Sequence, residues 1–84
     1  MKYYGQSNVD RDIHQKFITK TFTDGTFLEL GAIDGVKYSN TKFFEDNMGF
    51  DQGVLIEPDP QSFESLKVNR PNCCLLYTSD AADE

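Results

Sequence analysis

The sequence predicts an α/β fold: a partial Rossmann-like parallel sheet with flanking helices. Two short apolar runs, Phe27–Leu30 and Val54–Ile56, have the length and composition of strands, and each has an acid at or near its end. A helical pattern lies between them, and this order over roughly 30 residues is typical of a βαβ unit with parallel strands. We therefore expect a sheet that stops after about the second or third strand.

Length and composition narrow the possible functions. The 84 residues, 38% hydrophobic and 26% charged, suit one small core or part of a larger soluble domain. No apolar stretch approaches the roughly 18 residues of a membrane span, and no signal-peptide core follows Met1, so we expect no membrane partner and a cytoplasmic location. The net charge of −6 and the scattered basic residues argue against a nucleic-acid partner. The adjacent Cys73 and Cys74 offer no metal-binding set.

Residues 74–84 resemble the translation of a sequencing-library adapter. On this interpretation, residues 1–73 are the N-terminal part of a larger domain and residues 74–84 are a non-native tail. The alternative is a genuine strand, Cys74–Tyr77, followed by an acidic tail. In both cases the apolar run could pair with the sheet, because β-propensity depends on the side chains and their packing.

The first helix is expected at about 8–20. Ser7 to Asp10 has the form of a capping box, and Val9, Ile13 and Phe17 repeat at four-residue steps as an apolar stripe. His14 falls on the polar face of this helix, which indicates a solvated surface residue rather than a catalytic base.

The remaining elements follow the same reasoning. Strands are expected at about 26–31 and 53–57, and their continuous apolar runs are typical of strands covered on both faces. A chain of this length would nevertheless leave one face of the sheet uncovered. The intervening helix should begin near Ser39 or Asn40, bury Phe43, Phe44 and Met48, and stop at Gly49. Asp59 should cap a third helix with Pro60 at its first position, and a third strand should follow Pro71.

The loop after the first strand carries glycines but does not match a phosphate-binding motif. Gly31 lies where the backbone leaves the strand, and Gly35 allows an unusual dihedral before the next helix. A dinucleotide fingerprint that starts at Gly31 would need glycines at the positions of Ile33 and Val36. A nucleoside without phosphate at this loop fits better, and S-adenosylmethionine is a common one.

Acids at the strand ends support a nucleoside site. Glu57 ends the second strand, 22 residues after Gly35, at about the spacing at which an acid accepts hydrogen bonds from ribose hydroxyls. Glu29 would bind the ammonium of the methionine part through water or fix the loop, and Asp34 would orient backbone or ligand. The alternatives are ordinary: two glycines can form a simple turn, strand-end acids can be solvated, and Asp34 can be a turn former.

Three segments of the chain resemble the FkbM family of S-adenosylmethionine-dependent methyltransferases. They are Phe27–Val36, Ser39–Thr41 and Gly53–Pro60, together with Phe63, Leu66 and Asn69–Pro71. The lead-in around Tyr4–Gln6, with Asp10, Ile13 and Phe17, is also similar, so the resemblance covers nearly all of residues 4–73. Family members often have Asn at the position of Ile33.

The resemblance implies a methyltransferase that acts on a hydroxyl of a sugar, glycan or polyketide. By position, Glu29, Gly31, Ala32, Asp34 and Gly35 would contact the methionine end of S-adenosylmethionine and Glu57 would hold its ribose. Ser39 and Asn40 would cap the loop, or serve only as a helix N-cap. No catalytic base and no metal site is indicated.

The sequence therefore predicts the S-adenosylmethionine-binding half of an O-methyltransferase, inactive alone, whose partner is a small-molecule or glycan hydroxyl acceptor. Two alternatives stay open. One is a small non-enzymatic α/β module that binds a protein, and the other is a nucleotide-binding oxidoreductase domain with a degenerate fingerprint. The sequence does not indicate the oligomeric state.

Overall fold

The computed structural model describes residues 2–18 and 25–77. Along these residues, helices alternate with strands in the order η1 (Gln6–Asn8), α1 (Val9–Lys16), β1 (Thr26–Leu30), α2 (Lys42–Asn47), β2 (Gln52–Glu57), α3 (Pro60–Asn69) and β3 (Cys74–Tyr77). Helix η1 is a 3-10 helix. Among the described residues, no helix has both the length and the apolar character needed to cross a membrane.

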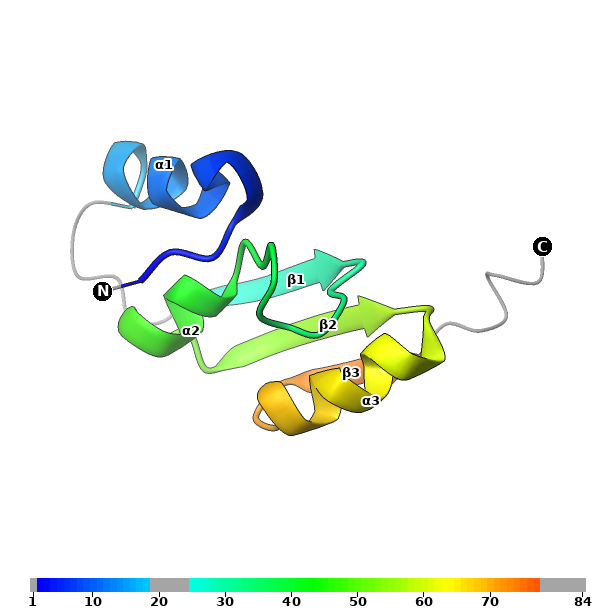
Figure 1. Ribbon diagram of the computed structural model, residues 1–84. Coiled ribbons are helices and arrows are strands. Elements are labelled where there is room, and N and C mark those ends of the chain that lie inside the picture. Colours follow the sequence, from blue (N-terminus) through cyan, green and yellow to red (C-terminus); the bar gives the residue numbers. More distant parts are fainter. Residues whose placement is uncertain (1, 19–24, 78–84) are drawn as a thin grey trace.

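The three strands form one parallel sheet in the order β1-β2-β3 (Figure 1). In the register, Leu28 lies beside Val54, and Val54 lies beside Cys74. The predicted α/β class and the parallel βαβ unit are confirmed. The third strand also forms as predicted, and it lies within the segment that resembles an adapter.

Helix α3 begins as the sequence predicts. Asp59 is the N-cap residue, its carboxylate accepts the N–H of Ser62 at 2.8 Å, and Pro60 takes the first helical position. The cap holds the pKa of Asp59 below its usual value of 3.8, because hydrogen bonds from Ser62 stabilise the carboxylate.

Helix α2 begins slightly later than predicted, at Lys42. The hydroxyl of Ser39 accepts the N–H of Lys42 at 3.0 Å and so supplies the cap from outside the helix. Gly49 follows the helix with a φ of +70°, a conformation that suits glycine, and Phe43 and Phe44 are buried as predicted.

The predicted bounds of the first helix are wrong. Helix α1 spans Val9–Lys16 rather than 8–20; Phe17 and Ile18 are not helical, and residues 19 and 20 lie outside the described residues. The predicted apolar stripe is broken as a result. Ile13 packs against the core, but Phe17 lies beyond the helix end and is 79% exposed.

The predicted capping box of α1 does not form. Ser7 and Asn8 both have left-handed backbone angles and make no side-chain cap. Asp10 is buried instead, and its carboxylate accepts the N–H of Tyr4 at 2.7 Å and that of Arg11 at 2.9 Å. The acid therefore ties the N-terminal segment to α1, because a buried carboxylate needs hydrogen-bond donors.

His14 is half-buried rather than solvated, which corrects the prediction from helical phase. Its Nδ1 lies 2.8 Å from the hydroxyl of Tyr3, and its ring centroid lies 4.7 Å from that of Phe43. The N-terminal segment and α2 cover the helix face that would otherwise meet solvent.

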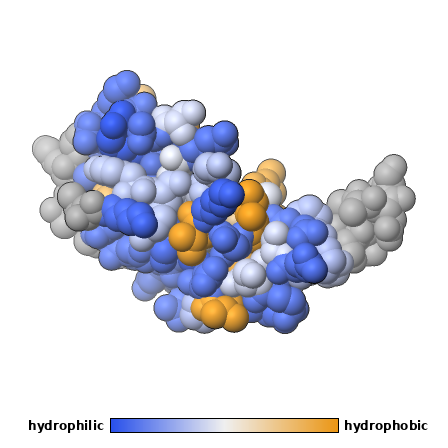
Figure 2. Space-filling model, viewed as in Figure 1, coloured by the Kyte–Doolittle hydropathy of each residue, from blue (hydrophilic) through white to orange (hydrophobic). Residues whose placement is uncertain are grey.

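Helices α2 and α3 lie on the same face of the sheet (Figure 1), and the core lies beneath them. It has two parts, a cluster around α3 made by Ala32, Leu55 and Leu66 and a cluster around α2 made by Phe43, Phe44 and Phe50. Viewed from this side, the surface is largely hydrophilic, with apolar atoms gathered near its middle (Figure 2).

The opposite face of the sheet is uncovered among the described residues. Leu28 is 62% exposed, Leu30 is 72% exposed and Leu76 is 46% exposed. These side chains belong to strands whose apolar pattern is typical of cover on both faces. Within residues 2–18 and 25–77, this exposure agrees with the prediction that one face of the sheet would be left uncovered.

Candidate functional site

The end of β2 and the loop after β1 meet through the carboxylate of Glu57. This side chain is 5% exposed; its Oε1 accepts the N–H of Ile33 at 2.6 Å and its Oε2 accepts the N–H of Asp59 at 2.9 Å. A carboxylate has about four acceptor positions, so each oxygen retains one beyond its backbone partner. Glu57 thus holds the glycine-bearing loop at the carboxyl edge of the sheet.

Gly31 and Ala32, which follow β1, differ in their surroundings. Gly31 has a φ of +68°, and a Cβ placed there would meet no atom within 4 Å, so open space lies above this residue. The side chain of Ala32 is buried beside Leu55 and Leu66, and its N–H donates to the carbonyl of Ile56 at 3.0 Å. Only the backbone of Ala32 could contact a ligand, whereas Gly31 presents an unobstructed surface.

Asp34 forms a turn of its own. Its Oδ1 accepts the N–H of Val36 at 2.9 Å and that of Lys37 at 2.8 Å. These two hydrogen bonds stabilise the carboxylate and hold the pKa of Asp34 below its usual value of 3.8. The backbone carbonyl of Asp34 also accepts Nδ2 of Asn69 at 2.9 Å, which connects the turn to α3.

Glu29 gathers the segment between the loop and α2. Its Oε1 accepts the hydroxyl of Ser39 at 3.0 Å and that of Thr41 at 2.6 Å, and its Oε2 accepts the N–H of Asn40 at 3.2 Å. Ser39 is fully buried and caps α2 at the same time. The structure therefore brings Glu29, Ser39 and Asn40 together. All three hydrogen bonds of the Glu29 carboxylate are to groups of this chain.

Arg70 is the residue at this site that sequence reasoning missed. It is 1% exposed and reaches under the loop, where Nη1 donates to the carbonyl of Gly35 at 2.8 Å and to the hydroxyl of Ser39 at 3.2 Å. Its Nη2 donates to Thr41 Oγ1 at 3.2 Å, and its Nε donates to Glu45 at 2.5 Å. A signal was present, because Arg70 falls on the apolar stripe of Phe63 and Leu66, and an arginine there indicates a buried charged partner.

Two bulky loop residues have left-handed backbone angles. Ile33 has a φ of +57° and Tyr38 has a φ of +61°. A β-branched residue rarely adopts this region, because its Cβ crowds the backbone. The N–H of Ile33 is the one that donates to Glu57, so this hydrogen bond helps to hold the strained conformation.

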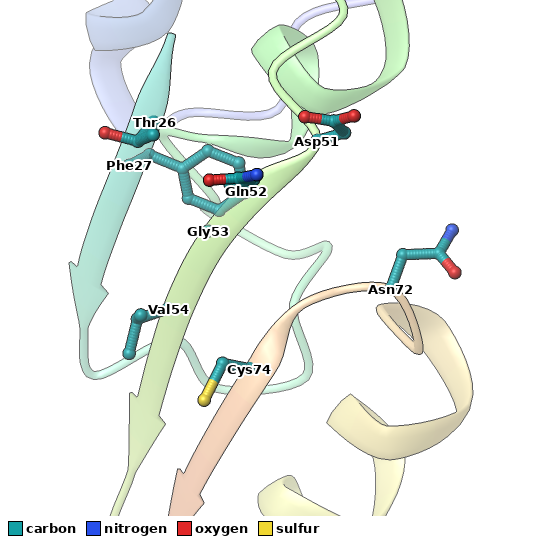
Figure 3. Close-up of a pocket in the computed structure, with 8 residues that line it drawn as sticks. All are labelled: Thr26, Phe27, Asp51, Gln52, Gly53, Val54, Asn72 and Cys74. Atoms are coloured by element: carbon teal, nitrogen blue, oxygen red, sulfur yellow. The ribbon is translucent and has the colours of Figure 1, made fainter.

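A hollow lies elsewhere, at the amino ends of the strands. It has a volume of about 460 Å³, and Figure 3 shows the lining residues, Thr26, Phe27, Asp51, Gln52, Gly53, Val54, Asn72 and Cys74. None of them is a predicted site residue. Ligands of open parallel sheets bind at the carboxyl edge, where Gly31 and Glu57 lie.

Among the described residues, no group of three or more His, Cys, Asp or Glu side chains is placed to hold a metal ion. His14, the one histidine of the sequence, contacts Tyr3 and Phe43. The predicted site residues form two hydrogen-bonded groups at one edge of the sheet, one around Glu57 and one around Glu29.

Comparison with known proteins supports the fold. No protein-family model and no curated protein sequence matches the chain significantly. A solved structure does: a chain in the complex between the Haloferax volcanii Trm112 methyltransferase activator and its candidate methyltransferase aligns with 84% of this chain at a TM-score of 0.53 and 16% identity. This chain spans 33% of the length of that chain. At this identity the likeness shows the fold alone, a partial Rossmann-like parallel sheet with flanking helices.

Proposed function

We propose that this chain is the S-adenosylmethionine-binding part of a methyltransferase of the FkbM type, which acts on a hydroxyl of a sugar, glycan or polyketide. The observation that carries the proposal is the 2.6 Å hydrogen bond from Ile33 N–H to Glu57. It joins the glycine-bearing loop to the strand-end acid at the sheet edge where parallel α/β folds bind nucleosides.

The residues present fit an S-adenosyl nucleoside. The space above Gly31 is open, and its φ of +68° suits a residue without a side chain, so a ligand can approach the backbone closely. Glu57 keeps acceptor positions for ribose hydroxyls beyond its two backbone bonds. Ile33 and Val36 stand where a pyrophosphate would need glycines, which favours a ligand without phosphate.

The bound cofactor would supply a methyl group on a sulfonium centre, open to in-line attack by the acceptor oxygen. The contribution of this chain is positioning. Glu57 would orient the ribose, and Gly31 would let the nucleoside lie against the strand end. Glu29 and Arg70 hold the loop through hydrogen bonds to its backbone, Glu29 as acceptor and Arg70 as donor. The carboxylates of Glu29 and Glu57 both accept hydrogen bonds from the loop, so neither is free to act as the base that an acceptor hydroxyl needs. We therefore propose that the 84-residue chain binds the cofactor without turning over an acceptor.

A titration of the ¹⁵N-labelled chain with S-adenosylmethionine tests the proposal. We expect shifts at Gly31 and Ile33, and Glu57→Gln should weaken binding about tenfold, since a hydrogen bond to a charged group contributes about 1.5 kcal/mol. The matched control is Glu64→Gln, which changes an exposed acid on α3. The amide spectrum of each variant shows whether it is folded.

Two results would contradict the proposal. Preferential binding of NAD over S-adenosylmethionine would favour the oxidoreductase alternative. A folded chain that binds neither ligand would favour the protein-binding module.

A further inference from the structure

Three lysines lie over two tyrosine rings, one ring on the N-terminal segment and one on the loop after β1. The Nζ atoms of Lys2 and Lys42 lie 5.2 Å and 5.4 Å from the ring centroid of Tyr4. The Nζ atom of Lys37 lies 5.2 Å from the ring centroid of Tyr38. We call these five residues the lysine–tyrosine patch. It concentrates positive charge in a chain whose net charge is −6.

The patch rests on a fixed backbone. A parallel β-bridge between Gly5 and Tyr38 brings the N-terminal segment beside the end of the loop. Buried Asp10 accepts the N–H of Tyr4 at 2.7 Å. A Cβ on Gly5 would lie 2.5 Å from Oδ1 of Asn40 and 2.7 Å from Oδ1 of Asp10, so these segments are in close contact. Residues far apart in the sequence thus form one surface.

The charge of the patch is only partly neutralised by the described residues. Lys42 pairs with Asp46 at 3.1 Å, whereas Lys2 and Lys37 form no ion pair within the part of the chain that the structure describes. The carboxylate of Asp34 acts on Lys37 by Coulomb attraction, but its Oδ1 is occupied by two backbone N–H groups. Lys2 and Lys37 therefore remain available to an external anion.

The aromatic part of the patch is also accessible. Tyr38 is 48% exposed, and its left-handed backbone holds a bulky ring at the surface. Residues held in sparsely populated conformations are concentrated at ligand-binding sites. An exposed tyrosine ring offers an apolar face and a polar hydroxyl, a combination suited to the mixed surface of a sugar ring.

We propose that the lysine–tyrosine patch binds the acceptor, and that this acceptor is an anionic saccharide. Its phosphate or carboxylate would lie against Lys2 and Lys37, and its ring would pack on Tyr38. Lys37 and Tyr38 lie on the loop that leaves the carboxyl end of β1, which also carries the predicted cofactor residues Gly31 and Asp34, and the bridge from Tyr38 to Gly5 joins this loop to the segment of Lys2 and Tyr4. The proposal rests on the proposed function and deepens it by naming the acceptor class.

The test uses the 84-residue chain and four probes: glucose 6-phosphate, glucuronate, glucose and inorganic phosphate. Amide shifts report binding and its location. We expect the two anionic sugars to bind and to shift Tyr4 and Tyr38. Lys37→Gln should weaken their binding about two- to fivefold, as expected for one exposed charge. Lys67→Gln is the matched control, because Lys67 also lies over a ring, at 5.6 Å from Phe63, but on α3.

Each outcome decides the proposal. Weakening by Lys37→Gln and not by Lys67→Gln supports it. Equal binding of glucose removes the role of charge, and equal binding of phosphate alone removes the role of the sugar ring. No binding by a chain with a folded amide spectrum overturns it. S-adenosylmethionine is titrated separately from the sugars. A chain that binds the anionic sugars but not S-adenosylmethionine would refute the proposed function while leaving the lysine–tyrosine patch as a site for anionic sugars.

Discussion

Arg70 packs directly on the Cα of Gly35. Its Nη1 donates to the Gly35 carbonyl at 2.8 Å, and a Cβ on Gly35 would lie 2.5 Å from Arg70 Cγ and 2.6 Å from Leu66 Cδ1. The glycine is therefore required by contact with α3 as well as by its φ of +83°. The second glycine of the loop thus serves the packing of α3 against the loop, and its consequences can be measured.

Gly35→Ala should destabilise the chain by about 2–4 kcal/mol, from left-handed strain plus overpacking. Gly31→Ala is the matched control, because Gly31 also has a positive φ but faces open space, and it should cost only about 1–2 kcal/mol. Urea unfolding monitored by far-ultraviolet circular dichroism measures both. Equal losses for the two variants would show that the contact with Arg70 and Leu66 contributes nothing.

Arg70→Met should destabilise the chain by about 3–5 kcal/mol, because it leaves the nearly buried acid Glu45 without its partner. Lys67→Met removes an exposed pair with Glu64 on the same helix and should cost at most about 1 kcal/mol. Both are measured by urea unfolding. The double variant Arg70→Met with Glu45→Met should recover much of the loss, and a double variant no more stable than Arg70→Met alone would contradict this account.

Ile33→Asn should stabilise the chain by about 1 kcal/mol, since Asn tolerates the left-handed region that Ile33 occupies. Val68→Asn provides the comparison, because Val68 is 79% exposed within α3 and has no such strain to relieve. Thermal unfolding of the two variants separates relief of strain from a general effect of Asn. A lower melting temperature for Ile33→Asn would show that the side chain of Ile33 contributes more than its backbone costs.

The two adjacent cysteines should react with iodoacetamide at different pH values. Burial raises the pKa of Cys73 to about 11, so at pH 8 its thiol stays protonated and unreactive. Cys74 is exposed on the uncovered sheet face. Mass spectrometry should find alkylation at Cys74 at pH 8, with Cys73 joining only as the pH approaches 11 or in denaturant. Rapid alkylation of Cys73 in the folded chain at pH 8 would contradict its burial beside Glu45.

The sequence was most informative where one residue determines its own local structure. The cap at Asp59 and the stop at Gly49 follow from short-range chemistry, and the parallel order of the strands follows from the βαβ connection; all were predicted. The partial burial of His14 was not predicted, because it depends on contacts with Tyr3 and Phe43 elsewhere in the chain. The early end of α1 was not predicted either.

The same distinction applies to the candidate site. Sequence spacing placed Gly31 and Glu57 at one edge of the sheet, since parallel strands end together. It could not show that the Glu29 carboxylate accepts hydrogen bonds from Ser39, Asn40 and Thr41, because those hydrogen bonds depend on the path of the loop. Arg70 was missed for a related reason: its three main partners lie 25 to 35 residues away in the sequence.

Strand β3 has a consequence for how this chain can be used. Its residues Cys74–Tyr77 pair in register with β2 although their sequence resembles a translated adapter. The exposed backbone of β2 thus acts as a template that accepts a short apolar segment through N–H and C=O groups common to any peptide. A peptide grafted after Cys73 would enter the sheet according to its alternation of side chains, so this junction can serve as a host for ranking strand-forming sequences by their effect on the unfolding midpoint.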